Sequence, residues 1–161
     1  MTDGLRIGLG LDTHRLAAGR RCRLGGIPIE SEVGPVGHSD GDAVLHSLVD
    51  AVLGAAGLDD LGTLFSDQDA ANRDRDSADF CAEACRQVGE AGFTIQSLDV
   101  VVEAERPKLM PYRAAMRARI AELFGIDGDR INVRGKTAEG LGSIGRGEAI
   151  RTTAVALLQK L

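Results

Sequence analysis

Tryptophan is absent from this chain, and aromatic side chains of any kind are scarce. Phe, Trp and Tyr together make up 3% of the 161 residues, whereas apolar residues as a whole make up 43%. A hydrophobic core built from these residues must therefore be aliphatic. A chain of this length is long enough to bury such a core in one domain, so we expect a single domain over residues 1–161.

Long apolar runs and an excess of positive charge are also missing. No stretch approaches the roughly 20 apolar residues of a transmembrane helix, and the N-terminus lacks the charged and then apolar layout of a signal peptide. The formal net charge is −5, which argues against a general nucleic-acid surface because phosphate contacts need clustered Lys and Arg. We therefore expect a cytoplasmic protein that binds neither nucleic acid nor membrane.

Cysteine is another scarce residue type. The chain has 3 cysteines, and an odd number without an export signal is typical of reduced thiols. Cys81 and Cys85 are spaced like a metal-binding pair, but Phe80, Ala84 and Val88 surround them in the sequence. We interpret the two cysteines as part of the apolar side of a helix.

Apolar periodicity and turn residues predict elements in the order β-β-α-α-β-α-β-β. The last segment fits a strand or a helix by its pattern, and its β-branched residues favour a strand. The predicted strands span residues 5–12, 22–30, 97–106, 130–135 and 149–159, the helices span 40–57, 76–92 and 111–125, and loops cover 30–40, 58–76 and 136–148.

This order predicts an α+β fold, in which helices pack on one face of a small mixed sheet. We expect a ferredoxin-like arrangement of the split βαβ type. The second face of the sheet would stay apolar and uncovered, which predicts that it is buried in an oligomer.

Histidine is rare, and all 3 histidines lie in the first third of the chain. Asp12 and His14 are two residues apart on a predicted strand, so both side chains point to the same face. If the helix that carries His46 packs on this strand, the three side chains converge. One carboxylate and two imidazoles form an ordinary zinc set with a fourth position open. Asp42 and Asp50 share the helix face of His46 and are candidates to orient its ring.

Interpretations of the same segment that involve no metal site remain open. His46 fits the surface of a helix, and His38 fits a loop. The motif "HSDGD" resembles part of a calcium loop but lacks the repeated oxygen ligands and the terminal glutamate. A turn into a helix capped by Ser39 or Asp40 explains this motif better.

A glycine-rich segment, "KTAEGLGSIGRGE", is the second candidate for chemistry. Its glycines allow the backbone to approach a ligand closely and to offer N–H groups to phosphate oxygens. Lys136 and Arg146 add positive charge, and Glu139 adds a carboxylate that suits a hard metal ion. From these residues alone, a flexible hairpin connection is an equally good interpretation.

Taken together, these motifs resemble the family of 2-C-methyl-D-erythritol 2,4-cyclodiphosphate synthases. The matching segments are "GLGLDTH", "GGIPI", "HSDGDAVLHSLVDAVLGAAGLDDLGTLFSD", "ERPKLMPY" and "KTAEGLGSIGRGE", which follow the family's order over the whole chain. The resemblance implies a phosphorus–oxygen lyase of the non-mevalonate isoprenoid pathway. This enzyme would convert 4-diphosphocytidyl-2-C-methyl-D-erythritol 2-phosphate to the cyclic 2,4-diphosphate and release CMP.

The resemblance also implies cofactors, an assembly and a role for each matching residue. It implies Zn²⁺ or another divalent ion on Asp12, His14 and His46, Mg²⁺ or Mn²⁺ on Glu139, and a homotrimer with active sites between subunits. The residues assigned to catalysis are His38, Asp42, Lys136, Thr137 and Glu139. The residues assigned to the cytidine diphosphate substrate are His38, Ser39, Asp60, Gly62, Phe65, Asp67, Ala104, Lys108, Leu109, Met110, Gly135, Lys136, Thr137 and Arg146. The loop that ends in "LFSD" is expected to be mobile and to close on the substrate.

Two positions depart from the family pattern, and two other functions stay open. Lys136 replaces a hydroxyl residue, and Ser143 replaces a phenylalanine that lines a cavity on the trimer axis. A serine makes that cavity wetter, which counts against binding of isoprenoid diphosphates there. The alternatives are a zinc phosphohydrolase, with Asp42 as the base that activates water, and a non-catalytic trimer that binds isoprenoid diphosphates.

Overall fold

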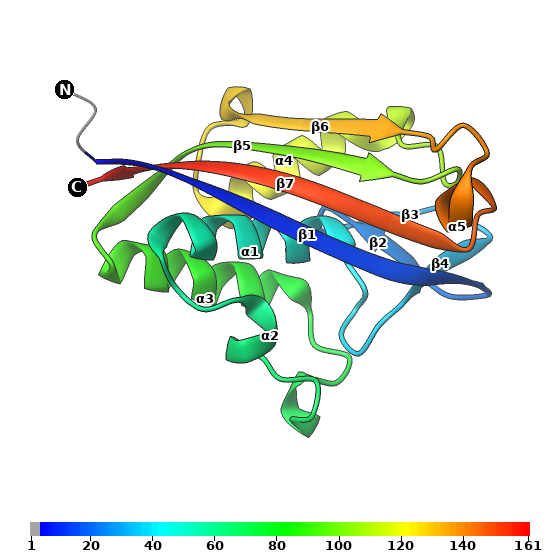
Figure 1. The fold of residues 1–161 in the computed structure, drawn as a ribbon, viewed down its shortest axis with the longest axis horizontal. Helices are drawn as coiled ribbons and strands as arrows, with labels where there is room; N and C mark the ends of the chain where they lie inside the picture. The colour runs from blue at the N-terminus through cyan, green and yellow to red at the C-terminus, as the bar shows by residue number, and fades with distance from the viewer. Residues whose placement is uncertain (1–3) are drawn as a thin grey trace.

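The computed structural model describes residues 4–161 and contains a twisted sheet with helices on one face (Figure 1). The strands follow the order β4-β1-β7-β5-β6 across this sheet. Among the pairs of neighbouring strands described in this sheet, only β5 and β6 run parallel, and the other pairs are antiparallel. The bounds of these strands are β1 Leu5–Ala18, β4 Val33–Val36, β5 Phe93–Glu103, β6 Ile131–Lys136 and β7 Ala149–Lys160.

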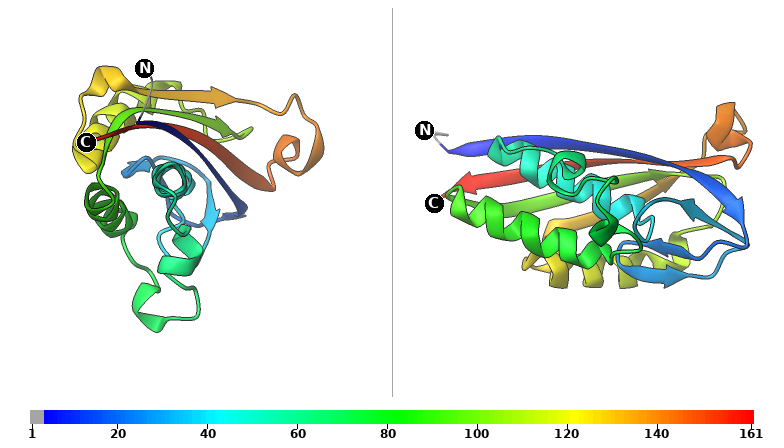
Figure 2. Two further views of the ribbon diagram at one scale, coloured as in Figure 1. Left: turned by 60° about the vertical axis from the view of Figure 1, so that its left-hand side comes forward. Right: turned by 90° about the horizontal axis from the view of Figure 1, so that it is seen from below.

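Three long helices cover the same face of the sheet, as the two views of Figure 2 show. They are α1 Ala43–Ala56, α3 Ser77–Glu90 and α4 Arg113–Phe124. Short turns complete the chain, namely α2 Leu61–Leu64, α5 Gly142–Gly145 and the 3₁₀ helices η1 Ala70–Asn72, η2 Met110–Tyr112 and η3 Gly128–Arg130. The core between sheet and helices is mainly aliphatic, as the composition predicts. Over residues 4–161, no helix has the length and apolar character to span a membrane.

The α+β class with a mixed sheet is confirmed, and the sheet contains a split βαβ unit. In a split unit another strand separates the two parallel strands. Strands β1 and β5 form such a unit, because both run antiparallel to β7, which lies between them, and α1 and α3 connect them. Strands β5 and β6 form a further parallel pair as direct neighbours, with Val100 opposite Val133, and α4 connects them. The ambiguous C-terminal segment is strand β7, which lies in the middle of the sheet between β1 and β5.

The segment 22–36 departs most from the predicted elements. The strand predicted over 22–30 is a hairpin of β2 Cys22–Leu24 and β3 Ile27–Ile29, because Gly25 and Gly26 turn the chain with positive φ angles of 65° and 78°. The loop predicted over 30–40 contains β4, which pairs with the second half of β1. Strand β1 therefore extends well beyond residue 12.

Asp42 fixes the start of α1. Its side chain accepts a hydrogen bond from Leu45 N at 3.0 Å, and also accepts from Gly25 N at 2.9 Å and Gly26 N at 2.7 Å. Burial raises the pKa of Asp42 to about 6, although the three backbone N–H groups act in the opposite direction. The carboxylate thus joins the β2–β3 turn to the first turn of α1.

Two glycines of β1 allow α1 to lie directly on the strand. A Cβ atom at Gly8 would be 1.9 Å from Ala51 O, and a Cβ atom at Gly10 would be 1.8 Å from Ser47 O. Side chains alternate along a strand, so Gly8 and Gly10 share the inner face of β1 with Asp12. The approach of α1 to this face brings the helix within reach of the strand's polar residues.

The three cysteines are free, and the two on α3 lie as predicted. Cys81 is buried, and the half-buried Cys85 donates through Sγ to Leu123 O at 3.8 Å. Burial raises the pKa of both thiols. These cysteines therefore pack as apolar residues and are not reactive thiolates.

We predict that Gly10→Ala lowers the free energy of unfolding by at least about 2 kcal/mol, because the new methyl group meets the backbone of α1. Gly89→Ala is the matched control, since nothing lies within 4 Å of a Cβ atom there and alanine favours a helix. Denaturant unfolding of both variants measures the difference. Equal stability of the Gly10→Ala and wild-type proteins would contradict the close contact.

Candidate metal centre and adjoining cavities

Asp12, His14 and His46 converge, as their spacing predicts. One ligand atom from each residue lies within 4.8 Å of the others. Asp12 Oδ2 is 2.7 Å from His14 Nε2 and 3.1 Å from His46 Nδ1. The first two residues come from β1 and the third comes from α1, so the site exists only because helix and strand are in contact.

The hydrogen bonds of His14 fit a metal ligand. His14 Nδ1 lies 3.0 Å from Val36 O, and a carbonyl oxygen only accepts, so Nδ1 carries a proton. In the neutral ring the lone pair is then on Nε2, which faces Asp12. A ring nitrogen held by a backbone carbonyl, with the other nitrogen free to bind, is the usual arrangement around protein-bound metals. A carboxylate and two imidazoles suit a divalent ion such as zinc.

The charges at this point favour an additional cation. Burial on its own would raise the pKa of Asp12, but hydrogen bonds from His14 and His46 outweigh it and lower the value to about 2. Burial likewise acts to lower the pKa of His14, yet Asp12 and the Val36 carbonyl raise it above the ordinary value. The site therefore holds an ionised carboxylate and stabilises positive charge beside it, either as protons or as a metal ion.

The second nitrogen of His46 faces two hydroxyl groups. His46 Nε2 lies 2.9 Å from Ser77 Oγ and 3.1 Å from Ser39 Oγ. The prediction that Asp42 or Asp50 orients this ring is wrong. The carboxylate of Asp42 is bound by backbone N–H groups, and Asp50 accepts from Leu61 N at 2.7 Å.

Ser77 was not predicted to act at this site, because no short-range spacing connects it with His46. It lies on α3, which is far from α1 in the sequence but packs beside it. The sequence indicates only that Ser77 lies at the N-terminus of α3, because it follows Asp76, which caps the helix through Ala78 N. A capping pattern predicts where a helix starts but not what its first residues contact.

A cavity of about 520 Å³ opens beside the three candidate ligands; we call it the metal cavity. The cavity is lined by six of the residues that the resemblance assigns to the substrate. They are His38, Ser39, Asp60, Gly62, Phe65 and Asp67. Asn72 and Phe80 also line the cavity and were not predicted. The sequence gives no signal for them, since both lie outside the matching motifs.

Aromatic packing holds the loop that lines this cavity onto α3. The rings of Phe65 and Phe80 lie 4.5 Å apart, and the Arg75 guanidinium lies 5.3 Å and 5.5 Å from their centroids. Asn72 Nδ2 donates to Ser66 O at 3.0 Å. In this structure the loop is therefore packed on the protein through Phe65.

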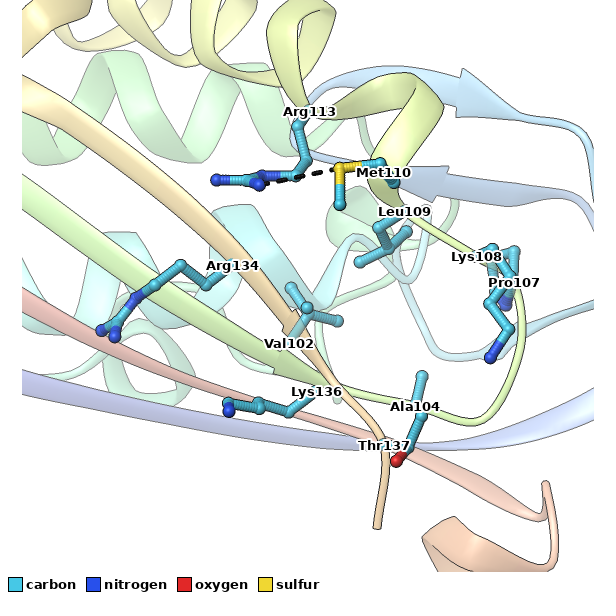
Figure 3. Close-up of a pocket in the computed structure, with 11 residues that line it drawn as sticks. Val102, Ala104, Pro107, Lys108, Leu109, Met110, Arg113, Arg134, Lys136 and Thr137 are labelled. Carbon is cyan, nitrogen blue, oxygen red and sulfur yellow. Dashed lines mark hydrogen bonds between the residues drawn. The ribbon is translucent and has the colours of Figure 1, made fainter. Parts of the chain in front are cut away.

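A second cavity, of about 430 Å³, lies between the ends of β5 and β6 and the segment before α4 (Figure 3); we call it the β5–β6 cavity. It gathers seven of the residues that the resemblance assigns to the substrate. They are Ala104, Lys108, Leu109, Met110, Gly135, Lys136 and Thr137. Val102, Pro107, Arg113 and Arg134 complete the lining and were not predicted.

Arg113 is one of these additional residues, and it is held by β6 and by the segment before α4. Its Nε donates to Val133 O at 2.7 Å, and one of its terminal nitrogens lies 3.8 Å from Met110 Sδ, as Figure 3 shows. It therefore connects the start of α4 with β6 at the edge of the cavity.

Glu139 and Arg146 line neither cavity. Glu139 lies in the loop after β6, where Thr137 Oγ1 donates to its carboxylate at 3.4 Å. Arg146 pairs with Glu148 at 3.0 Å. Glu105, which was not predicted, holds this loop by accepting from Ala138 N at 3.0 Å and Gly140 N at 3.4 Å.

The metal cavity and the β5–β6 cavity share no lining residue. The two groups of residues that the resemblance connects are thus separated on one chain.

Comparison with known proteins shows which family this chain is similar to. The YgbB family model matches residues 5–159. The 2-C-methyl-D-erythritol 2,4-cyclodiphosphate synthase of Burkholderia lata is 49% identical over 155 residues, with 96% of both chains covered. The bifunctional enzyme IspD/IspF of Albidiferax ferrireducens is also 49% identical, and this chain covers 96% of its own length but 37% of that protein. A solved structure of a synthase in its CDP-bound form superposes with a TM-score of 0.89 at 42% identity, with 96% of this chain and 100% of that chain covered.

We predict that zinc affinity falls as the pH decreases through the raised pKa of His14, because a proton on Nε2 competes with the metal. Asp12 should contribute little to this change, because its pKa is already about 2. Calorimetry in buffers of different ionisation enthalpy measures the protons released.

The variants that check this site differ in a single imidazole. His46→Ala should lose zinc, whereas His38→Ala, in the same cavity but outside the ligand set, should retain it. Affinity independent of pH, or zinc retained by His46→Ala, would contradict the assignment.

Proposed function

The chain belongs to the YgbB family, and from this premise we propose that it catalyses the formation of 2-C-methyl-D-erythritol 2,4-cyclodiphosphate in isoprenoid biosynthesis. Relatives that match almost the whole chain are enzymes named for this product. The substrate is 4-diphosphocytidyl-2-C-methyl-D-erythritol 2-phosphate, and CMP is the second product. The observation that carries the proposal is the convergence of Asp12, His14 and His46 at the wall of a cavity.

The reaction needs no nucleophile from the protein. An oxygen of the substrate's 2-phosphate forms a bond to the β-phosphorus, and the bond from the β-phosphorus to the bridging oxygen breaks. CMP leaves with that oxygen and the electron pair. Because two anionic phosphates must approach each other, catalysis consists mainly of positioning and of neutralising charge.

The residues of the two cavities suit this task. A divalent ion on Asp12, His14 and His46 would supply positive charge for the phosphates when bound. In the metal cavity, His38 and Ser39 would hold the methylerythritol phosphate end. In the β5–β6 cavity, the apolar walls would hold the cytosine ring while Lys108 and Lys136 attract the diphosphate.

We also propose a homotrimer in which the metal cavity of one subunit meets the β5–β6 cavity of its neighbour. The outer face of β1 exposes Ile7, Leu9 and Leu11, at 74%, 59% and 58% of their surface. Such an apolar stripe on a sheet is typical of an interface. An assembly of this kind would bring Glu139, the proposed Mg²⁺ or Mn²⁺ ligand, and Arg146 towards the shared site.

The alternative functions receive less support from the site. A phosphohydrolase would need a base to activate water, and Asp42 is completely buried with its oxygens bound to backbone N–H groups. A binding protein without catalysis does not require three metal ligands that converge beside a substrate-sized cavity.

We predict that the purified protein with zinc and magnesium releases CMP and a cyclic product from the proposed substrate. His46→Ala and Thr137→Ala, each inactive alone, should together recover about a quarter of wild-type activity, because random mixing leaves that share of intersubunit sites intact. Co-expression followed by CMP measurement tests this.

The matched control mixes His46→Ala with Asp12→Ala, which damage the same cavity and should recover nothing. A linear phosphate product would refute the cyclase. Absence of recovery in the first mixture, with wild-type CMP release intact, would refute only the shared site.

A further inference from the structure

We propose that Ser77 and Asp40 act as positioning residues that fix which nitrogen of His46 is available to the metal. This inference deepens the proposed function, because it concerns the metal site on which that function rests. It assigns a role to a serine on α3 and to an aspartate in the loop before α1, neither of which carries a predicted role in the chemistry.

The direction of each hydrogen bond follows from Asp40. Its Oδ2 accepts from Ser77 N at 2.9 Å, and its Oδ1 accepts from Asp42 N at 3.0 Å and lies in a very short contact with Ser77 Oγ. The carboxylate oxygens accept from these backbone N–H groups, and Ser77 Oγ is the donor in its contact with Oδ1. The single hydroxyl proton of Ser77 is therefore donated to Asp40.

With its proton used in this way, Ser77 Oγ can only accept from His46. The two atoms Ser77 Oγ and His46 Nε2 are 2.9 Å apart, so Nε2 must carry the proton. When the ring is neutral, as a metal ligand must be, the other nitrogen, Nδ1, then carries the lone pair and faces Asp12 Oδ2 at 3.1 Å. A proton on Nδ1 instead would occupy the atom that belongs to the candidate ligand set.

Burial distinguishes Ser77 from the other hydroxyl group near the ring. Ser39 Oγ also lies 3.1 Å from Nε2, but Ser39 lies in the loop before α1 and its surface lines the metal cavity. Ser77 is fully buried in the first turn of α3. Its hydroxyl therefore keeps one orientation whether or not the cavity is filled.

The same network connects the metal site with two further elements. Asp40 N donates to Arg75 O at 3.3 Å, next to the start of α3. Asp40 thus joins the loop before α1 to the N-terminus of α3, and Ser77 extends this connection to His46 on α1. The imidazole is oriented by a helix that supplies no ligand, which is a common way to stabilise a ligand's geometry.

Metal affinity tests the role of each residue. Ser77→Ala and Asp40→Asn should each weaken zinc binding roughly 10–100-fold in a chelator competition. The matched controls are Ser47→Ala, a buried serine that donates to Val44 O, and Asp76→Asn, the neighbouring helix cap. Both controls should bind zinc like the wild type. A folded Ser77→Ala protein with wild-type zinc affinity would overturn the proposal.

A spectroscopic test on the wild-type protein needs no variant to fold. The protein is loaded with a spin-active cadmium isotope in place of zinc, and the ring nitrogens of isotope-labelled histidine are observed by NMR. We expect coupling from cadmium to Nδ1 of His46 and a proton on Nε2. Coupling to Nε2, or no coupling to His46, would overturn the proposal. Because no substrate is used, this result is independent of whether CMP is released.

Discussion

The contact between α1 and β1 is the constraint on which the rest of the structure depends. Gly8 and Gly10 have no side chains, and this absence lets the backbone of the helix lie against the strand. The carboxylate and imidazole of Asp12 and His14 then meet the imidazole of His46, a residue from another element. A larger residue in either glycine position would move the helix and separate the ligands. The aliphatic core stabilises the contact between α1 and β1, and the candidate metal site lies at one end of this contact.

The distribution of charge explains why this contact can serve phosphate chemistry. Asp12 contacts two imidazoles and favours positive charge beside it, in the wall of the metal cavity. A folded substrate with neighbouring phosphates carries the opposite charge. The lysines of the β5–β6 cavity provide further positive charge at the other end of the proposed substrate. The two cavities of one chain remain separate, so the assembly of chains becomes part of the proposed mechanism.

The local part of this arrangement could be predicted from the sequence. Alternation along β1 places Asp12 and His14 on one face, and helical periodicity places His46 on the apolar helix α1. The strand β7 follows from its β-branched residues. The substrate-binding residues that were predicted in the two cavities came from resemblance to a family and not from spacing. The hairpin over 22–29 was missed because two glycines reverse the chain within a segment that otherwise has the pattern of one strand.

Contacts between distant segments could not be predicted. The approach of Asp42 to the β2–β3 turn uses a carboxylate that spacing assigned to His46, because helix periodicity identifies a shared face but not the partner that the face meets. Ser77 reaches His46 across 31 residues of sequence, and only the packing of α3 beside α1 brings them together. The segment "GLGLD" was predicted as part of a strand, but the close contact of its glycines with a helix becomes visible only in three dimensions.

X-ray absorption at the zinc edge of the metal-loaded protein tests the central claim most directly. The account predicts a shell of nitrogen and oxygen atoms at about 2.0–2.1 Å, with outer scattering from two imidazole rings. A sulfur ligand, or scattering from fewer than two imidazoles, would show that the strand and helix residues do not form the metal site.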